Sequence, residues 1–214
     1  MIRTPPLELR NRLAEIVLAA LHDPAAREDL ARIAETAAAL PPWCAGAAAP
    51  EVALVRARAR RATEALAGGP RLAREPSLAA ALRAAAALFD AGLHFEVHEL
   101  LEPHWTRATG PRREVLQGLI QIAVGYQHLA NGNVGGARAL LAEGSRRLRD
   151  AASDVPLSDH DLRAFADAVS AAAATIGATT AAAVPPFPRH HDEHATDASA
   201  ALARGEGRGS RAEG

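Results

Sequence analysis

The chain has 214 residues and a formal net charge of −1, with 24 basic against 25 acidic side chains. Alanine makes up about a quarter of the residues and aromatic residues only 3%; this composition favours helices and excludes an all-β fold. The balanced charge provides no global field that would draw the chain to nucleic acid or to an anionic membrane, so neither partner is expected.

Nothing in the sequence indicates export or membrane insertion. Residues 1–12 contain charged side chains and two prolines where a signal peptide would need an apolar run. The longest weakly polar segments, 37–55 and 164–184, are interrupted by prolines or by Asp167, so neither is predicted to span a membrane. Cys44 is the only cysteine and forbids an internal disulfide, which suits a reducing compartment. These observations predict a cytoplasmic protein.

Three helices are predicted in residues 1–70, which we expect to form an amino-terminal helical extension. Apolar residues recur at helical spacing from Leu7 to Leu21, after two prolines that suit a helix start. A second helix follows Asp23 and is expected to reach about residue 40, where two prolines stop it. The third is expected over residues 51–66, and its arginines indicate a solvated face. These arginines are Arg56, Arg58, Arg60 and Arg61.

A helical core domain is predicted over residues 76–177, and residues 178–214 are expected to be a disordered tail because their composition supports no packed core. The core helix from 110 to 131 is apolar almost all round, as is typical of a helix buried in a bundle. Gly118 and Gly125 on it would permit close approach of another helix. We therefore expect an all-α fold, a compact antiparallel bundle. The core helices are expected at 78–90, 93–106, 110–131, 134–150 and 158–176.

The helix at 93–106 combines a packing face with a chemical face. At about 100° per residue, His94, His98, Glu102 and Trp105 fall close together, with Glu99 beside them. Side chains at i and i+4 on one helix can converge on one point, as metal ligands and hydrogen-bonded clusters require.

A narrow polar stripe lies on the otherwise apolar helix at 110–131. It consists of Gln117, Gln121 and His128. A buried polar group costs about 1–3 kcal/mol unless it is hydrogen-bonded, so the stripe needs partners. The connection through Gly110 and Pro111 is short, which makes the two helices antiparallel neighbours and the His/Glu face the obvious partner.

Three interpretations of these residues remain open. The first is a buried hydrogen-bond network that specifies the fold and has no further role. The second is a divalent metal site, since helical bundles build such sites from Glu and His on facing helices. The third is a metal-free small-molecule pocket in which a Glu-oriented histidine acts as acid or base. The candidate metal ligands are His94, His98, Glu102 and His128, with Glu99 as a further candidate.

An ordered set of motifs resembles the bacterial family called domain of unknown function 309. The family strings are F-x-x-G-x-x-x-E-x-H-E-x-x-E-x-x-W, G-L-I-Q and H-x-x-x-G-N. The resemblance covers about residues 78–148 and implies a compact helical fold, with no established activity. His94 stands where the family more usually has an aromatic residue. The matching positions are Phe89, Gly92, Glu96, His98, Glu99, Glu102, Trp105, Gly118, Gln121, His128, Gly132, Asn133 and Ala137.

We expect the polar residues to form a pocket between the two antiparallel helices. Within this pocket, His98 and Glu102, supported by Glu99, are expected to transfer a proton or to contact a ligand. The alternative is a helical interaction scaffold, favoured by a segment at 128–141 that looks like a tetratricopeptide turn. Enzymatic activity stays open, and a small molecule, a divalent metal or a homo-oligomer would each be compatible with the sequence. The expected pocket residues are Glu96, His98, Glu99, Glu102, Trp105, Gln117, Gln121 and His128.

Overall fold

The protein is described from a computed structural model, which covers residues 2–69, 71–151, 161–177 and 183–189. These described residues form helices and no strand, so the prediction of an all-α fold is confirmed. A short 3₁₀ turn, η1 (Pro42–Cys44), separates α2 from α3. The α-helices are α1 (Leu7–Ala19), α2 (Pro24–Ala34), α3 (Ala49–Leu66), α4 (Leu78–Asp90), α5 (His94–Arg107), α6 (Gly110–Ala130), α7 (Val134–Ala151) and α8 (Leu162–Thr175).

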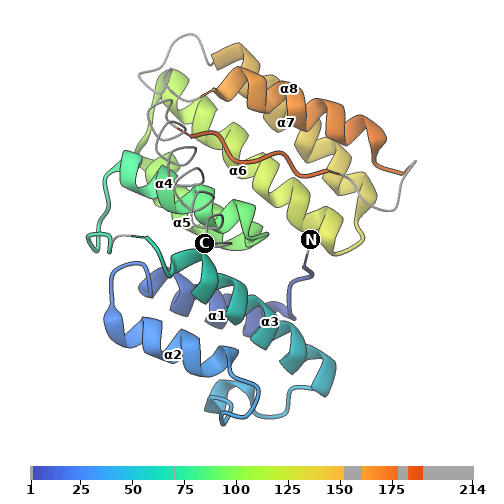
Figure 1. Ribbon diagram of the computed structural model, residues 1–214. Helices are drawn as coiled ribbons and strands as arrows, with labels where there is room; N and C mark the ends of the chain where they lie inside the picture. The colour runs from blue at the N-terminus through green and yellow to red at the C-terminus, as the bar shows by residue number, and fades with distance from the viewer. Residues whose placement is uncertain (1, 70, 152–160, 178–182, 190–214) are drawn as a thin grey trace, which may run out of the picture.

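The helices pack in layers around one continuous core (Figure 1). The lower layer holds α1, α2 and α3, the middle holds α4, α5 and α6, and the upper holds α7 and α8. α1 packs against α5 and α3 against α4, while α6 and α7 make the most extensive contact of any helix pair. Buried apolar side chains extend from Leu9 in α1 to Phe187 near the carboxyl end of the described chain. The amino-terminal helices therefore share the core of the rest of the molecule.

Three helices start at capping residues in the sequence. The side chains of Asp23, Ser77 and Asp161 each accept a hydrogen bond from a backbone N–H in the first turn of α2, α4 and α8. The second helix was expected to reach about residue 40 but ends at Ala34. Arg56 of α3 donates to the carbonyl oxygens of residues 33, 35 and 38, so a side chain satisfies the end of α2.

Two of the four arginines of α3 do not lie on the solvated face that their clustering suggested. Arg56 binds the end of α2, and Arg58 is 1% exposed and faces the middle layer. Arg61 donates to the carbonyl oxygen of Ala91 at 3.1 Å. The prediction was wrong for Arg56 and Arg58, because a charge run on one helix does not reveal which acceptors another layer supplies, whereas Arg60 and Arg61 are exposed as expected.

Glycines allow α6 and α7 to touch backbone to backbone. A Cβ atom added at Gly118 would lie 2.9 Å from the carbonyl oxygen of Gly144, and one added at Gly144 would lie 2.8 Å from that of Gly118. At Gly125 an added Cβ would lie 2.9 Å from the side chain of Leu141. The expectation that Gly118 and Gly125 permit a close helix crossing is confirmed, and the partner is α7.

Residues 183–189 differ from the expected disordered tail. Phe187 is 2% exposed and packs against the rings of Phe89 and Phe165, with centroids 5.2 and 5.8 Å away. The backbone N–H of Phe187 donates to Asp90 at 2.9 Å, and Arg189 forms an ion pair with the same carboxylate. A single aromatic residue in an otherwise weak pattern anchors this segment to the core. The rest of the expected tail, 178–182 and 190–214, lies outside the described residues.

Candidate functional site

α5 brings His98, Glu99 and Glu102 together at the surface. His98 Nδ1 lies 3.0 Å from a carboxylate oxygen of Glu99, and His98 Nε2 lies 3.9 Å from one of Glu102. One potential ligand atom from each residue lies within 4.8 Å of the other two. The side chains are 26%, 35% and 49% exposed, so solvent reaches all three. We call these residues the His98 cluster.

His94 does not join the His98 cluster. Its side chain is 2% exposed and lies among aromatic rings, 4.8 Å from the Phe89 centroid and 5.5 Å from that of Tyr126. Burial, and secondarily the charge of Arg58, lowers the pKa of His94 to about 3, so this imidazole is neutral at ordinary pH. The candidate metal set of His94, His98, Glu102 and His128 is therefore not assembled: α5 turns His94 into the core, where the family resemblance implies an aromatic residue.

Glu96, expected in the pocket, faces the lower layer instead. It is completely buried and forms an ion pair with Arg58 of α3. Glu96 Oε1 and Arg58 Nε have no hydrogen-bond partner among the described residues, so one contact between the two side chains holds the pair. The role of this carboxylate is to join two layers.

α5 and α6 are neighbours as expected, but Gln121 of the glutamine stripe packs towards α7, where a Cβ added at Gly144 would lie 3.2 Å from the Gln121 Cβ. The guanidinium of Arg113 stacks 4.0 Å over the Trp105 ring and donates to the Trp105 carbonyl oxygen at 2.8 Å. Trp105 Nε1 and Gln121 Oε1 are buried without a hydrogen-bond partner among the described residues, and Gln117 is half-buried. None of these side chains forms a hydrogen bond with the His98 cluster among the described residues.

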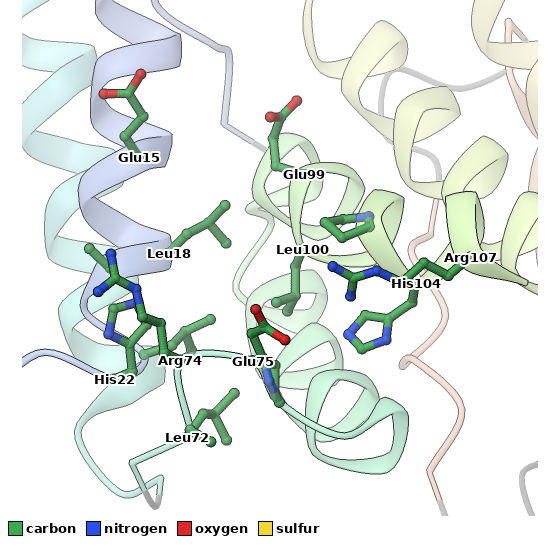
Figure 2. Close-up of a pocket in the computed structure, with 15 residues that line it drawn as sticks. Glu15, Leu18, His22, Leu72, Arg74, Glu75, Glu99, Leu100, His104 and Arg107 are labelled. Atoms are coloured by element: carbon green, nitrogen blue, oxygen red, sulfur yellow. The ribbon is translucent and has the colours of Figure 1, made fainter.

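A cavity of about 500 Å³ lies between α5, α1 and the segment at 72–76 (Figure 2). Leu18 and Leu100 approach each other across it, and Glu15 and Glu99 lie at one end. Glu99 thus belongs both to the cavity wall and to the His98 cluster. The sequence did not reveal this cavity, because its walls come from segments far apart in the chain with no shared motif.

The comparison with protein families matches one part of the chain. Residues 82–140 match the model described as "Domain of unknown function (DUF309)". No curated protein and no solved structure matched the chain. The resemblance noted in the sequence is confirmed, and the DUF309 match contains the whole His98 cluster. Residues 15–22 and 72–76 of the cavity lie outside the match.

The histidine of the H-x-x-x-G-N motif in the DUF309 match closes a turn. The Asn133 side-chain amide lies 2.8 Å from His128 Nδ1, which places an N–H donor against the ring nitrogen. The carbonyl oxygen of the same amide accepts from the N–H of Gly136 at 2.9 Å and so caps α7. Gly132 has φ of 84°, and a Cβ at Gly136 would lie 2.7 Å from His128. His128 therefore stabilises the α6–α7 turn and does not join the other candidate metal ligands.

Within the described part of the chain, no helix is both long and apolar enough to cross a bilayer.

Proposed function

We propose that the protein binds a divalent transition-metal ion at the His98 cluster. The observation that supports this function is the convergence of one imidazole and two carboxylates on two successive turns of α5, with potential ligand atoms within 4.8 Å of one another. An imidazole nitrogen with carboxylate oxygens is a donor set that suits zinc, manganese or iron.

The distances agree with a shared ion after a small adjustment. Metal bonds to histidine nitrogen and carboxylate oxygen are about 2.0–2.2 Å long, so two ligands of one ion are at most about 4.3 Å apart. The 3.9 Å separation between His98 Nε2 and Glu102 already meets this limit. Glu99 must approach by a side-chain rotation, which its 35% exposure permits. Two carboxylates also supply the negative charge that a dication needs.

Three protein ligands leave coordination positions for water or a substrate, as in catalytic rather than purely structural metal sites. The exposure of the cluster gives a ligand direct access to those positions. The proposed role is therefore that of an open metal site on a rigid helix.

A second candidate function rests on the 3.0 Å contact between His98 Nδ1 and Glu99. Without metal, this carboxylate would orient the imidazole and leave Nε2 directed towards Glu102 and solvent. A histidine held in this way can exchange a proton with a bound molecule as a general acid or base. Both functions require His98, but only the first requires metal.

The test is isothermal titration of the full-length, metal-free protein with Zn²⁺ and Mn²⁺. We expect one equivalent of either ion to bind, and we expect His98→Ala to remove that binding while the far-UV circular dichroism spectrum stays unchanged. Glu99→Gln and Glu102→Gln keep the side-chain shape and should each weaken it.

The matched control addresses the histidines near the carboxyl end of the sequence. A variant with His190, His191 and His194 all replaced by alanine should keep the one equivalent. If that variant loses the metal while His98→Ala retains it, the proposed site is wrong. If the wild-type protein binds neither ion, the metal function is refuted and the orienting contact with Glu99 remains the candidate.

A further inference from the structure

The cavity between α1, residues 72–76 and α5 shares Glu99 with the His98 cluster and is otherwise lined by different residues. Its volume of about 500 Å³ falls within the range typical of small-molecule pockets. Aliphatic side chains from three segments form its walls, and charged side chains surround them. The aliphatic residues are Leu18, Leu21, Leu72 and Leu100.

The cationic groups of the cavity are two arginines, Arg74 and Arg107. Arg74 and Arg107 form no ion pair with any residue in the described part of the chain, although both line the cavity. Figure 2 shows Arg74 beside His22 on the α1 side and Arg107 beside His104 on the α5 side. Burial, and then the charge of Arg107, lowers the pKa of His104, which disfavours a positive charge on this imidazole beside Arg107.

Carboxylates line the same cavity. Glu75 has no hydrogen bond or ion pair with another described residue. Figure 2 places it between the two arginine side chains, and Glu15 and Glu99 lie at the far end. Glu15 pairs with Arg12 and Glu99 contacts His98, but a carboxylate has about four lone-pair sites and can accept further donors. A ligand therefore meets both signs of charge around an apolar centre.

We propose that this cavity binds a small zwitterion with an apolar body, such as a short peptide of apolar residues. The carboxylate of the ligand is held by one of the two arginines, Arg74 or Arg107, which lie on opposite sides of the cavity with Glu75 between them, since arginine is well suited to carboxylate recognition. Its ammonium group is held by the glutamates, and its apolar side chains lie against Leu18 and Leu100.

The amino-terminal helices gain a role from this proposal. Glu15 and Leu18 lie on α1, and Leu72 and Arg74 lie in the segment before α4, all outside residues 82–140. The region that matches DUF309 supplies only the α5 wall. Binding of the ligand therefore requires α1 and residues 72–76 as well as α5.

The experiment is isothermal titration of the full-length protein with three probes, in the presence of a metal chelator so that the outcome does not depend on the proposed metal function. The probes are the dipeptide leucyl-phenylalanine, its N-acetyl derivative, which lacks the ammonium group, and its carboxamide, which lacks the carboxylate. We expect saturable binding of the dipeptide, with each derivative at least about tenfold weaker, because each loses a charge-assisted contact.

Two substitutions test the assignment of the charges. Arg74→Ala with Arg107→Ala should weaken binding of the dipeptide about tenfold or more while leaving the weak binding of the carboxamide unchanged. The matched control is Arg112→Ala, an exposed arginine of α6 that does not line the cavity. Ala73→Trp should abolish binding by filling the space, with the fold checked by circular dichroism.

Several results would overturn the proposal. The absence of saturable binding of all three probes refutes the site, and equal binding of all three refutes the role of the charges. Tightest binding of the N-acetyl derivative would make the ligand a simple anion and refute the zwitterion. An equal loss in Arg112→Ala would show that net charge, and not the cavity, controls binding.

Discussion

The buried ion pair between Arg58 and Glu96 allows a quantitative prediction about stability. Arg58→Met removes the charge and keeps an unbranched side chain, which leaves the Glu96 carboxylate in the core without its partner. Because the two side chains are 1% and 0% exposed, water cannot replace the lost contact without a rearrangement of the layers. We expect the free energy of unfolding to fall by about 3–5 kcal/mol. That is a large part of the roughly 5–15 kcal/mol that stabilises a typical protein.

The assay is urea denaturation followed by far-UV circular dichroism at neutral pH. The double variant Arg58→Met with Glu96→Leu removes both charges and should recover most of the loss, because a buried pair is often replaceable by apolar residues. Arg12→Met breaks the exposed pair with Glu15, whose side chains are 59% and 62% exposed, and serves as the control. That control should cost less than about 1 kcal/mol. A loss below about 1 kcal/mol in Arg58→Met, or a double variant no more stable than the single, would refute this reasoning.

Three further predictions concern other buried positions. The free energy of unfolding should fall as the pH is lowered from 6.5 towards 3, because His94 takes up a proton in the unfolded chain but not in the folded one, where its pKa is about 3. The expected slope is about 1.4 kcal/mol per pH unit. Urea titrations across that pH range should show this contribution in the wild type and not in His94→Phe. Gly118→Ala should destabilise by about 1–3 kcal/mol, whereas Gly135→Ala, whose Cβ meets nothing within 4 Å, should stabilise by about 0.5–1 kcal/mol; equal shifts in thermal melting would contradict the α6–α7 contact. Phe187→Ala should cost about 3–5 kcal/mol in urea unfolding, and a negligible cost would mean that residues 183–189 are not part of the core.

The helices were predictable because their signals are local. Apolar periodicity, prolines and glycines gave α4 its observed bounds and placed most other helix ends within a few residues. The end of α2 could not be predicted in this way, because Arg56 from another helix satisfies its carbonyl groups. The same holds for Phe187, which depends on a surface that α4 and α8 build.

The candidate site was predictable only where it depends on one helix. The i, i+4 spacing correctly placed His98 beside Glu102, and Glu99 follows from adjacency. Spacing could not show that His94 and Glu96 face into the core on opposite sides of that cluster, since burial depends on which layers cover α5. The expected pocket between α5 and α6 required those residues to share a face, and the cavity beside Glu99 instead lies between α5 and α1.

The α6–α7 pair has a consequence for the order of folding. α6 ends at Ala130 and α7 begins at Val134, so the most extensive helix contact joins segments that are adjacent in the chain. Closing so short a loop has a small entropic cost, and contacts of this local kind form fast. The lower layer and residues 183–189 join the rest through contacts between distant parts of the chain, so we expect them to assemble on a preformed helical hairpin. In native-state hydrogen exchange, the central amides of α6 and α7 should accordingly be the last to exchange, and those near Phe187 among the first of the buried groups.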